Sequence, residues 1–435
     1  MLWVYAVERT LMLILLTSAI SVTIGTITAI AAWWSNKFWA YYIPLLTLAV
    51  PPWLLSFFLS DTFGYINPWV GASVSLGVCC SVYPHCLVSS SLANRAYKNW
   101  EMLSVIRGRG VKTLLMALWP SLRISLVPSF AIIAAECIAD FGVSNYYGID
   151  TVTTTAFNIW TSTWSMSHLW WGVFILGVFG LTISRLDVFD LTSIQSDNTN
   201  NSHFGWAIFA ITPTLLLIGY SVFTSSYWVI LGATFRSTDL WIEFFNTLYL
   251  TFLVIIVCIS VVALYLTNTA KQLLERTGMG LYAMPGVVIG ATIMCAFGKI
   301  VPLIILLSFA IALRYYGLII STVAVADKGS QKYFEAISTY TSSKIKMLAM
   351  KARLILPATT LGVCLIVLDV IRELPISMIL QPMNFQTLAM RMSYIARNEA
   401  IPDLGPHSLL ILGLGAIFCI IIVKVLRDTD KRLKL

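Results

Sequence analysis

The sequence predicts an all-α polytopic membrane protein, and three observations support this fold class. The 435 residues are 58% hydrophobic and only 11% charged, whereas soluble domains carry about 25% charged residues. Many apolar runs approach the roughly 20 residues that a helix needs to cross a bilayer. Tryptophan and tyrosine gather near the ends of these runs, for example at Trp33–Trp34 and Trp170–Trp171, as they do at membrane interfaces.

We expect eleven transmembrane helices, each an apolar stretch bounded by charged, polar or turn-forming residues. The expected spans are 10–33, 38–60, 67–91, 121–143, 167–185, 205–230, 241–267, 279–298, 300–325, 357–380 and 406–426.

Basic residues predict the orientation of these spans, because cytoplasmic loops collect Lys and Arg. If the loop containing Lys37 is cytoplasmic, 21 of the 28 basic residues lie on that side and five on the other. The N-terminus is then outside and the C-terminus is cytoplasmic. The net charge of +8 has the same topological origin, so nucleic acid is not expected as a partner.

An internal repeat divides the chain into two halves. Similar residues recur at offsets of 234 to 237: Arg9-Thr10-Leu11 with Asn246-Thr247-Leu248, Ala49-Val50-Pro51 with Ala283-Met284-Pro285, Glu101 with Glu335, and Pro120 with Pro357. Six spans separate the copies, so both run in the same direction as a parallel repeat. We therefore expect two parallel five-helix repeats joined by a linking helix.

The expected domain boundaries follow from this repeat. They are a first repeat 1–186 with a polar, basic loop 93–120, a cytoplasmic linker 187–204, a linking transmembrane helix 205–231, a second repeat 240–427 with a corresponding loop 326–357, and a basic cytoplasmic tail 428–435.

The two polar loops are the strongest functional signal. Each starts with a glutamate and ends in a proline, and each is expected to form a short amphipathic helix, a turn and a second helix. Pro120 and Pro357 are expected to begin the fourth and tenth spans, because proline suits the first turn of a helix. A cationic loop repeated in both halves indicates that the same partner docks twice.

These loops resemble the EAA loop of ABC importer permeases, in which a glutamate, small residues, a glycine and a final Leu-Pro follow in order. The matching residues are Glu101, Arg107, Gly108 and Pro120 in the first loop, and Glu335, Ala336, Leu356 and Pro357 in the second. The first loop departs from the pattern with Met102-Leu103, and the second is three residues longer and lacks the glycine.

The segments after the loops, Ala139–Gly142 and Asp369–Pro375, resemble signatures of ferric-iron importer permeases. The resemblance implies a type I ABC importer permease fold in a bacterial inner membrane. It also implies that a periplasmic binding protein delivers ferric iron and that two copies of a separate ATPase dock on the loops. ATP then binds to that partner, and this chain needs no cofactor of its own.

Four acidic residues fall in or beside the expected spans: Glu136, Asp140, Asp369 and Glu373. Ionisable groups inside a membrane are costly and suggest function. Glu136 and Glu373 lie sixteen residues after the two prolines, roughly 24 Å along their helices, so we expect them to face each other across the repeat axis. Oxygen ligands attract hard cations, which predicts a path for ferric iron.

A structural role for these residues is the alternative. In that case Arg372 pairs with a carboxylate and Asp140 caps the end of the fourth span.

Other functions are less favoured. Eight cysteines without a CxxC pair and four scattered histidines give no disulfide framework or zinc site, and no nucleophile–base group or Walker A pattern occurs, so the chain is not expected to be an enzyme. The cargo could instead be thiamine, sulfate or a polyamine. An ATP-independent secondary transporter is a second class, since such proteins use broken helices and Pro51-Pro52 or Pro285-Gly286 are potential breaks.

Overall fold

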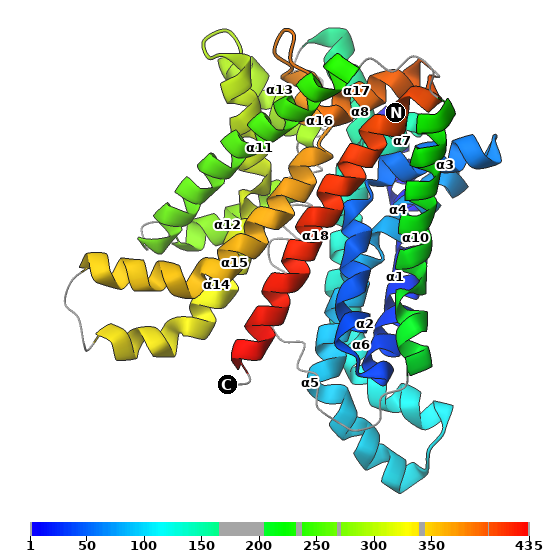
Figure 1. The fold of residues 1–435 in the computed structure, drawn as a ribbon, viewed down its shortest axis with the longest axis vertical. Coiled ribbons are helices and arrows are strands. Elements are labelled where there is room, and N and C mark those ends of the chain that lie inside the picture. The colour runs from blue at the N-terminus through cyan, green and yellow to red at the C-terminus, as the bar shows by residue number, and fades with distance from the viewer. Residues whose placement is uncertain are drawn as a thin grey trace.

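The computed structural model describes residues 2–164, 204–231, 237–267, 271–338, 344–398 and 400–433. These residues form helices and connecting segments, with no strand among them (Figure 1). The helices of the first half are α1 Leu2–Ser35, α2 Phe38–Tyr42, η1 Ile43–Ala49, α3 Pro52–Phe63, α4 Pro68–Cys80, α5 Val82–Arg107, α6 Val111–Ala139, α7 Gly142–Tyr146 and α8 Val152–Thr163. Those that follow are α10 Phe204–Leu231, α11 Ser237–Leu266, α12 Lys271–Tyr282, α13 Gly286–Phe297, α14 Leu303–Ser338, α15 Lys344–Ile371, α16 Pro375–Ile379, α17 Leu388–Arg397, η3 Ile401–Leu404 and α18 Gly405–Leu433.

The helices have the lengths and composition of a polytopic membrane protein. In the described residues, eight segments are long and apolar enough to cross a bilayer, and two bent pairs make up to ten. The bent pairs are 38–49 with 52–63, at 78°, and 271–282 with 286–297, at 110°. The first pair covers the predicted span 38–60, whereas the second begins eight residues before the predicted span 279–298. The predicted span 167–185 and almost all of the linker 187–204 lie outside the described residues.

The two halves repeat the same local structure. In each bent pair, the helix that comes after the break is preceded by a proline, Pro51 in the first half and Pro285 in the second. The backbone angles of the two prolines are nearly equal (φ −62°, ψ 134° and φ −59°, ψ 137°). Thr10 Oγ1 in α1 accepts a hydrogen bond of 2.9 Å from the amide of Val152 at the start of α8. Thr247 Oγ1 in α11 accepts one of the same length from Leu388 at the start of α17.

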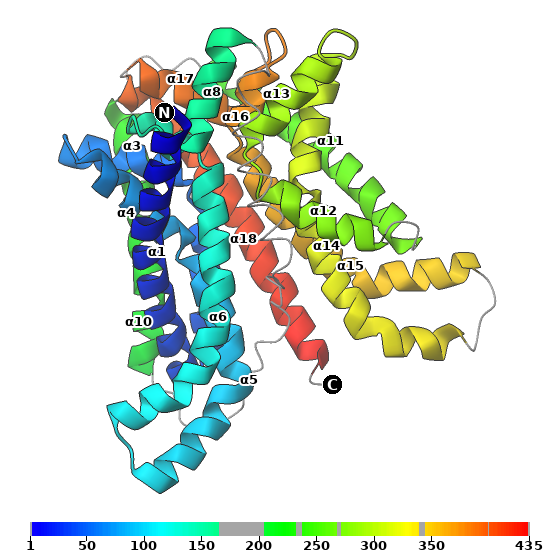
Figure 2. The same ribbon diagram turned by 180° about the vertical axis from the view of Figure 1, so that it is seen from behind.

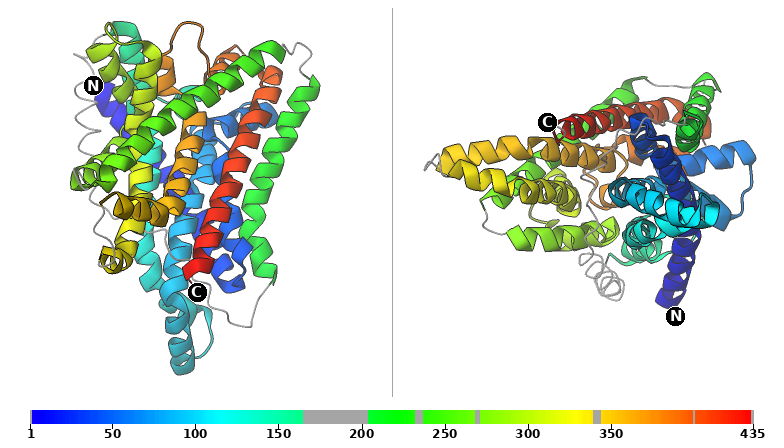
Figure 3. Two further views of the ribbon diagram at one scale, coloured as in Figure 1. Left: turned by 60° about the vertical axis from the view of Figure 1, so that its left-hand side comes forward. Right: turned by 90° about the horizontal axis from the view of Figure 1, so that it is seen from below.

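The halves lie side by side, with the C-terminal helix between them. Figures 1 and 2 show α1, α4, α5 and α6 with α10 on one side, α11 to α15 on the other, and α18 between. The α5–α6 hairpin extends beyond the end that carries the C-terminus, whereas the facing parts of α14 and α15 extend sideways from the half of the molecule nearer that end (Figure 1). The N-terminus lies at the other end, as Figure 3 also shows.

Each of these projections is a hairpin of two long helices, rather than a short separate helix. Gly108, with a φ of +79°, ends α5, a left-handed conformation that glycine adopts at low cost. Pro120 and Pro357 lie inside α6 and α15, so the prediction that they begin helices was wrong. Polarity marks where a span enters the membrane, but the helix itself starts earlier, at the glycine turn in the case of α6. The predicted tail is, through residue 433, the last part of α18.

We expect Thr10→Val and Thr247→Val each to lower the free energy of unfolding by about 1–3 kcal/mol, because each leaves a buried amide without its acceptor. Unfolding followed in detergent measures this. Thr23→Val is the control, since the exposed Thr23 hydroxyl bonds only to Ala19 O in its own helix. A loss of stability in only one of the two variants would show that the contacts are not equivalent.

Candidate functional site

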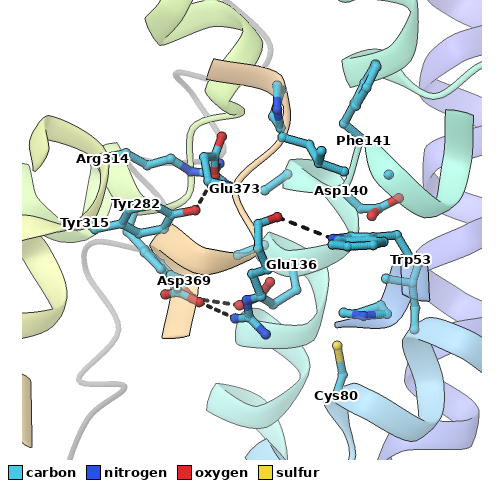
Figure 4. A pocket seen from close by; sticks show the side chains of 18 residues that line it. Trp53, Cys80, Glu136, Asp140, Phe141, Tyr282, Arg314, Tyr315, Asp369 and Glu373 are labelled. Atoms are coloured by element: carbon cyan, nitrogen blue, oxygen red, sulfur yellow. Dashed lines mark hydrogen bonds and ion pairs between the residues drawn. The ribbon is translucent and has the colours of Figure 1, made fainter. Parts of the chain in front are cut away.

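The four predicted carboxylates line one pocket where the halves meet (Figure 4). Its volume is about 80 Å³, enough for a few water molecules. Besides Glu136, Asp140, Asp369 and Glu373, the lining includes Trp53 of α3, Cys80 of α4, Tyr282 of α12, Arg314 and Tyr315 of α14, and Arg372. Trp53 Nε1 donates a hydrogen bond of 3.3 Å to the carbonyl of Arg372 and so joins the two halves.

Two of the carboxylates cap the short helices that follow the breaks after α6 and α15. Asp140 accepts hydrogen bonds from the amides of Val143 (3.2 Å) and Ser144 (2.9 Å) at the start of α7. Glu373 Oε1 accepts one of 3.2 Å from Ile376 at the start of α16. Carboxylates stabilise helix N-termini by accepting these otherwise unpaired amides. The sharp reversals at these helix ends bring both acids into the pocket.

This capping geometry changes the expected pairing of the acids between the halves. Asp140 and Glu373 occupy equivalent positions, 233 residues apart, and Glu136 is then equivalent to Asp369. The prediction from the sequence, that Glu136 is equivalent to Glu373, was therefore wrong. Counting from Pro120 and Pro357 misplaces the pairs by four residues, about one helical turn, because those prolines are 237 residues apart.

Both second-half acids have an arginine partner. Arg314 Nη1 lies 2.7 Å from Glu373 Oε2, and Arg372 pairs with Asp369. The hydroxyl of Tyr315 also donates to Glu373. The acids are 5% and 3% exposed, and charges this buried require such partners. The structural alternative considered from the sequence is therefore present here in the Arg372 pair, whereas Asp140 caps the start of α7 rather than the end of the fourth span.

Glu136 has a different environment. Its Oε1 accepts hydrogen bonds from the hydroxyls of Tyr83 (2.8 Å) and Tyr282 (2.6 Å), and no lysine or arginine of the described residues forms an ion pair with it. The pocket contains four carboxylates against two guanidinium groups, so two acidic groups are in excess. Within the described chain, no cluster of three or more His, Cys, Asp or Glu is arranged to hold a metal ion.

A larger cavity adjoins this pocket. It has a volume of about 710 Å³ and shares Trp53, Phe141, Gly142 and Leu374 with the pocket. Tyr65, Tyr146, Tyr147 and Arg397 are among its other lining residues. Its walls come largely from α3, α7 and α17, which lie at the end away from the hairpins (Figure 1). The cavity provides an approach to the acids from that end.

The residues matched to the EAA loop lie on the hairpins, apart from the pocket. Glu101, Arg107, Gly108 and Pro120 are exposed, and Leu356 is 60% exposed beside the partly buried Pro357. Glu335 and Ala336 belong to the last turns of α14, for which only the backbone is described.

Sequence reasoning missed three residues that shape the pocket. Arg314 is a positive charge inside the predicted span 300–325, a signal that could have identified it as the partner of an acid. Tyr83 and Tyr282 had no such signal, because tyrosine is common at membrane interfaces. Comparison of the chain with protein-family models, curated proteins and solved structures gives no match.

We expect Arg314→Met to lower the free energy of unfolding by roughly 3 kcal/mol, because it leaves the buried Glu373 without its counter-charge. The double variant Arg314→Met/Glu373→Gln should recover most of that loss in a denaturation series. Arg9→Met provides the control: Arg9 and Asp150 are exposed, and such pairs contribute about 0–1 kcal/mol. Equal losses in the single and double variants would argue against a charge-pairing role.

Proposed function

We propose that this chain is the membrane-spanning permease subunit of an ATP-binding-cassette importer that moves a hard cation, ferric iron, inward. One observation carries the proposal: two helical hairpins, α5–α6 and α14–α15, occupy equivalent places in the repeat, and both lie in the half of the molecule nearer the C-terminus (Figure 1). An acidic pocket lies between the halves, near the ends of α6 and α15 that are distant from those hairpins (Figure 1).

The hairpins suit a pair of identical docking partners. Because the repeat is parallel, equivalent surfaces of α5–α6 and α14–α15 are presented on one side of the membrane. In this proposal a separate ATPase binds there in two copies, the hairpin end and the C-terminus face the cytoplasm of a bacterium, and the chain lies in the inner membrane. A periplasmic binding protein docks at the other end, over the larger cavity.

The pocket chemistry favours a cationic cargo. Two uncompensated acidic groups in a low-dielectric site attract positive charge, and carboxylate and hydroxyl oxygens suit hard ions. The likeness of Asp369–Pro375 to ferric-iron permeases selects iron among such cations. The acidic excess disfavours sulfate, whereas thiamine and polyamines carry positive charge and are competing cargoes to be tested.

A second candidate is an ATP-independent secondary transporter. The helix breaks at Pro51 and Pro285 favour it, since secondary transporters place their binding sites at discontinuous helices. Reconstitution distinguishes the two classes. Co-purification with an ATPase and a binding protein, followed by cargo-stimulated ATP hydrolysis in liposomes, is expected for an importer. Cargo uptake by the chain alone, without ATP, would favour the second candidate.

The double variant Glu136→Gln/Glu373→Gln is expected to abolish ferric-iron uptake, because it removes two of the four charges that attract the ion. Binding of the ATPase should be retained, since the hairpins are distant from the pocket. Uptake of radioactive iron and ATPase co-purification measure the two effects. Asp150→Asn, an exposed acid outside the pocket, is the control, and unchanged uptake in the double variant would refute the cation path.

A further inference from the structure

The helix α12 forms a contact between the halves beside the pocket. Tyr282, its last residue, donates to Glu136 of α6, and the next residue, Ala283, packs with Ala131 and Ala135 of α6 in a small cluster. We call the contacts of Tyr282 and Ala283 with these three residues of α6 the seam. Because α6 runs from the hairpin towards the pocket, Ala131 and Ala135 place the seam on the hairpin side of Glu136.

The same helix is fixed to α14. A Cβ atom added to Gly317 would lie 2.3 Å from the carbonyl oxygen of Gly278, so the backbones of α14 and α12 touch at a point where only glycine fits. The residues immediately before the two glycines also interact, since Thr277 Oγ1 and the Tyr316 hydroxyl are 2.6 Å apart. Backbones this close do not slide past each other without disrupting tight packing, so α12 and α14 form one unit.

An ion-pair bridge extends this unit to the second hairpin. Asp327 of α14 pairs with Lys271, the first residue of α12, and with Lys351 of α15, whose Nζ lies 3.0 Å away. The carboxylate therefore joins α12 to both helices of the hairpin. A displacement of that hairpin would be transmitted through α12 to the seam.

Glu136 is the pocket carboxylate most available to an incoming cation. Asp369 and Glu373 form ion pairs with arginines and Asp140 caps a helix. The hydrogen-bond partners of Glu136 in the described structure are two neutral hydroxyls, and the charges of Arg372 and Arg314 act on it from beyond ion-pair distance. A hydroxyl donor leaves the negative charge of a carboxylate without a counter-charge, whereas an arginine in an ion pair supplies one.

A second observation indicates that the pocket accepts an oxygen-bearing group. Arg314 is 7% exposed and lines the pocket, yet its Nε–H has no acceptor among the described residues. Nearly all buried donors in proteins are satisfied by protein, water or ligand. A hard cation carries oxygen ligands that meet this requirement.

We infer that Glu136 is the cation-binding carboxylate of the pocket and that its hydrogen bond with Tyr282 holds α12 against α6. We call this hydrogen bond the latch. In the closed seam, Tyr83 of the first half and Tyr282 of the second share its Oε1. A cation in the pocket takes the carboxylate from Tyr282, which frees α12 to move with α14 and α15 and opens the pocket towards the hairpins. This inference rests on the proposed transport function and narrows its binding step to one residue.

Cys80 provides a reporter for the seam. It is free, buried and lines the pocket, whereas its neighbour Cys79 is free and buried without lining it. An impermeant maleimide is added to inverted and to right-side-out membrane vesicles that contain the full chain, and labelling of each cysteine is measured by peptide mass spectrometry. Gallium(III) citrate is the probe, because gallium has the charge of ferric iron and does not oxidise thiols.

In the wild-type protein, gallium is expected to raise the rate of Cys80 labelling from the hairpin side about tenfold. Loss of one hydrogen bond to a charged group raises the population of the open seam by about this factor. Citrate alone should have no effect, and Cys79 should stay unlabelled. Tyr282→Phe should give fast Cys80 labelling without gallium, because the latch is missing. Glu136→Gln should label slowly with or without gallium, because the amide oxygen still accepts from Tyr282 but carries no charge.

Tyr265→Phe is the matched control. The Tyr265 hydroxyl donates to Glu275 at 2.7 Å, the same kind of bond as in the seam, and both residues lie in the second half. This variant should behave like wild type. The inference is overturned if gallium leaves the labelling of Cys80 in the wild-type protein unchanged, a result that does not depend on the folding of any variant. It is also overturned if gallium accelerates Cys80 labelling in Glu136→Gln. A gallium response without ATP-driven uptake would instead overturn the importer and leave the latch standing.

Discussion

The cost of placing carboxylates between apolar helices organises the centre of this molecule. A charge in such surroundings is tolerated only with donors close by, and here the donors come from separate elements: Tyr83 from α5, Tyr282 from α12 and Arg314 from α14. Satisfying the acids therefore fixes how these helices sit against α6 and α15. The pocket is a consequence of that requirement, because the acids meet where both helices end and the chain reverses.

The two halves have similar backbone structures, but the side chains that they contribute to the pocket differ in charge. Glu136 and Asp140 correspond to Asp369 and Glu373, yet only the second pair has arginine partners. At the offset of 234 that relates Pro51 to Pro285, Cys80 is the first-half counterpart of Arg314. Equivalent backbones give each half a helical hairpin, while unequal side chains leave negative charge on the first-half side of the pocket. A duplicated scaffold can in this way combine similar backbones with an asymmetric pocket.

Local signals in the sequence predicted the helical membrane architecture, the repeat and the acidic residues of the pocket, because apolar length and residue offsets do not depend on tertiary contacts. The same signals failed where the outcome depends on packing. Pro120 lies within α6 because the glycine turn at Gly108, rather than the proline, precedes the helix. Tyr83 and Tyr282 come together only through the fold, so neither residue type nor spacing identifies them as partners of Glu136.

The breaks between helices also help to accommodate the buried charges of the pocket. Irregular backbone is tolerated at membrane depth where it lines a cavity or is buried in protein, and Gly286, directly after Pro285, lies against the Arg314–Glu373 pair: a Cβ there would be 2.9 Å from Arg314 Nη1 and from Glu373 Oε1. The break ends α12 at the seam and makes room for the ion pair beside it. The break at Pro285 is thus explained by the construction of the pocket.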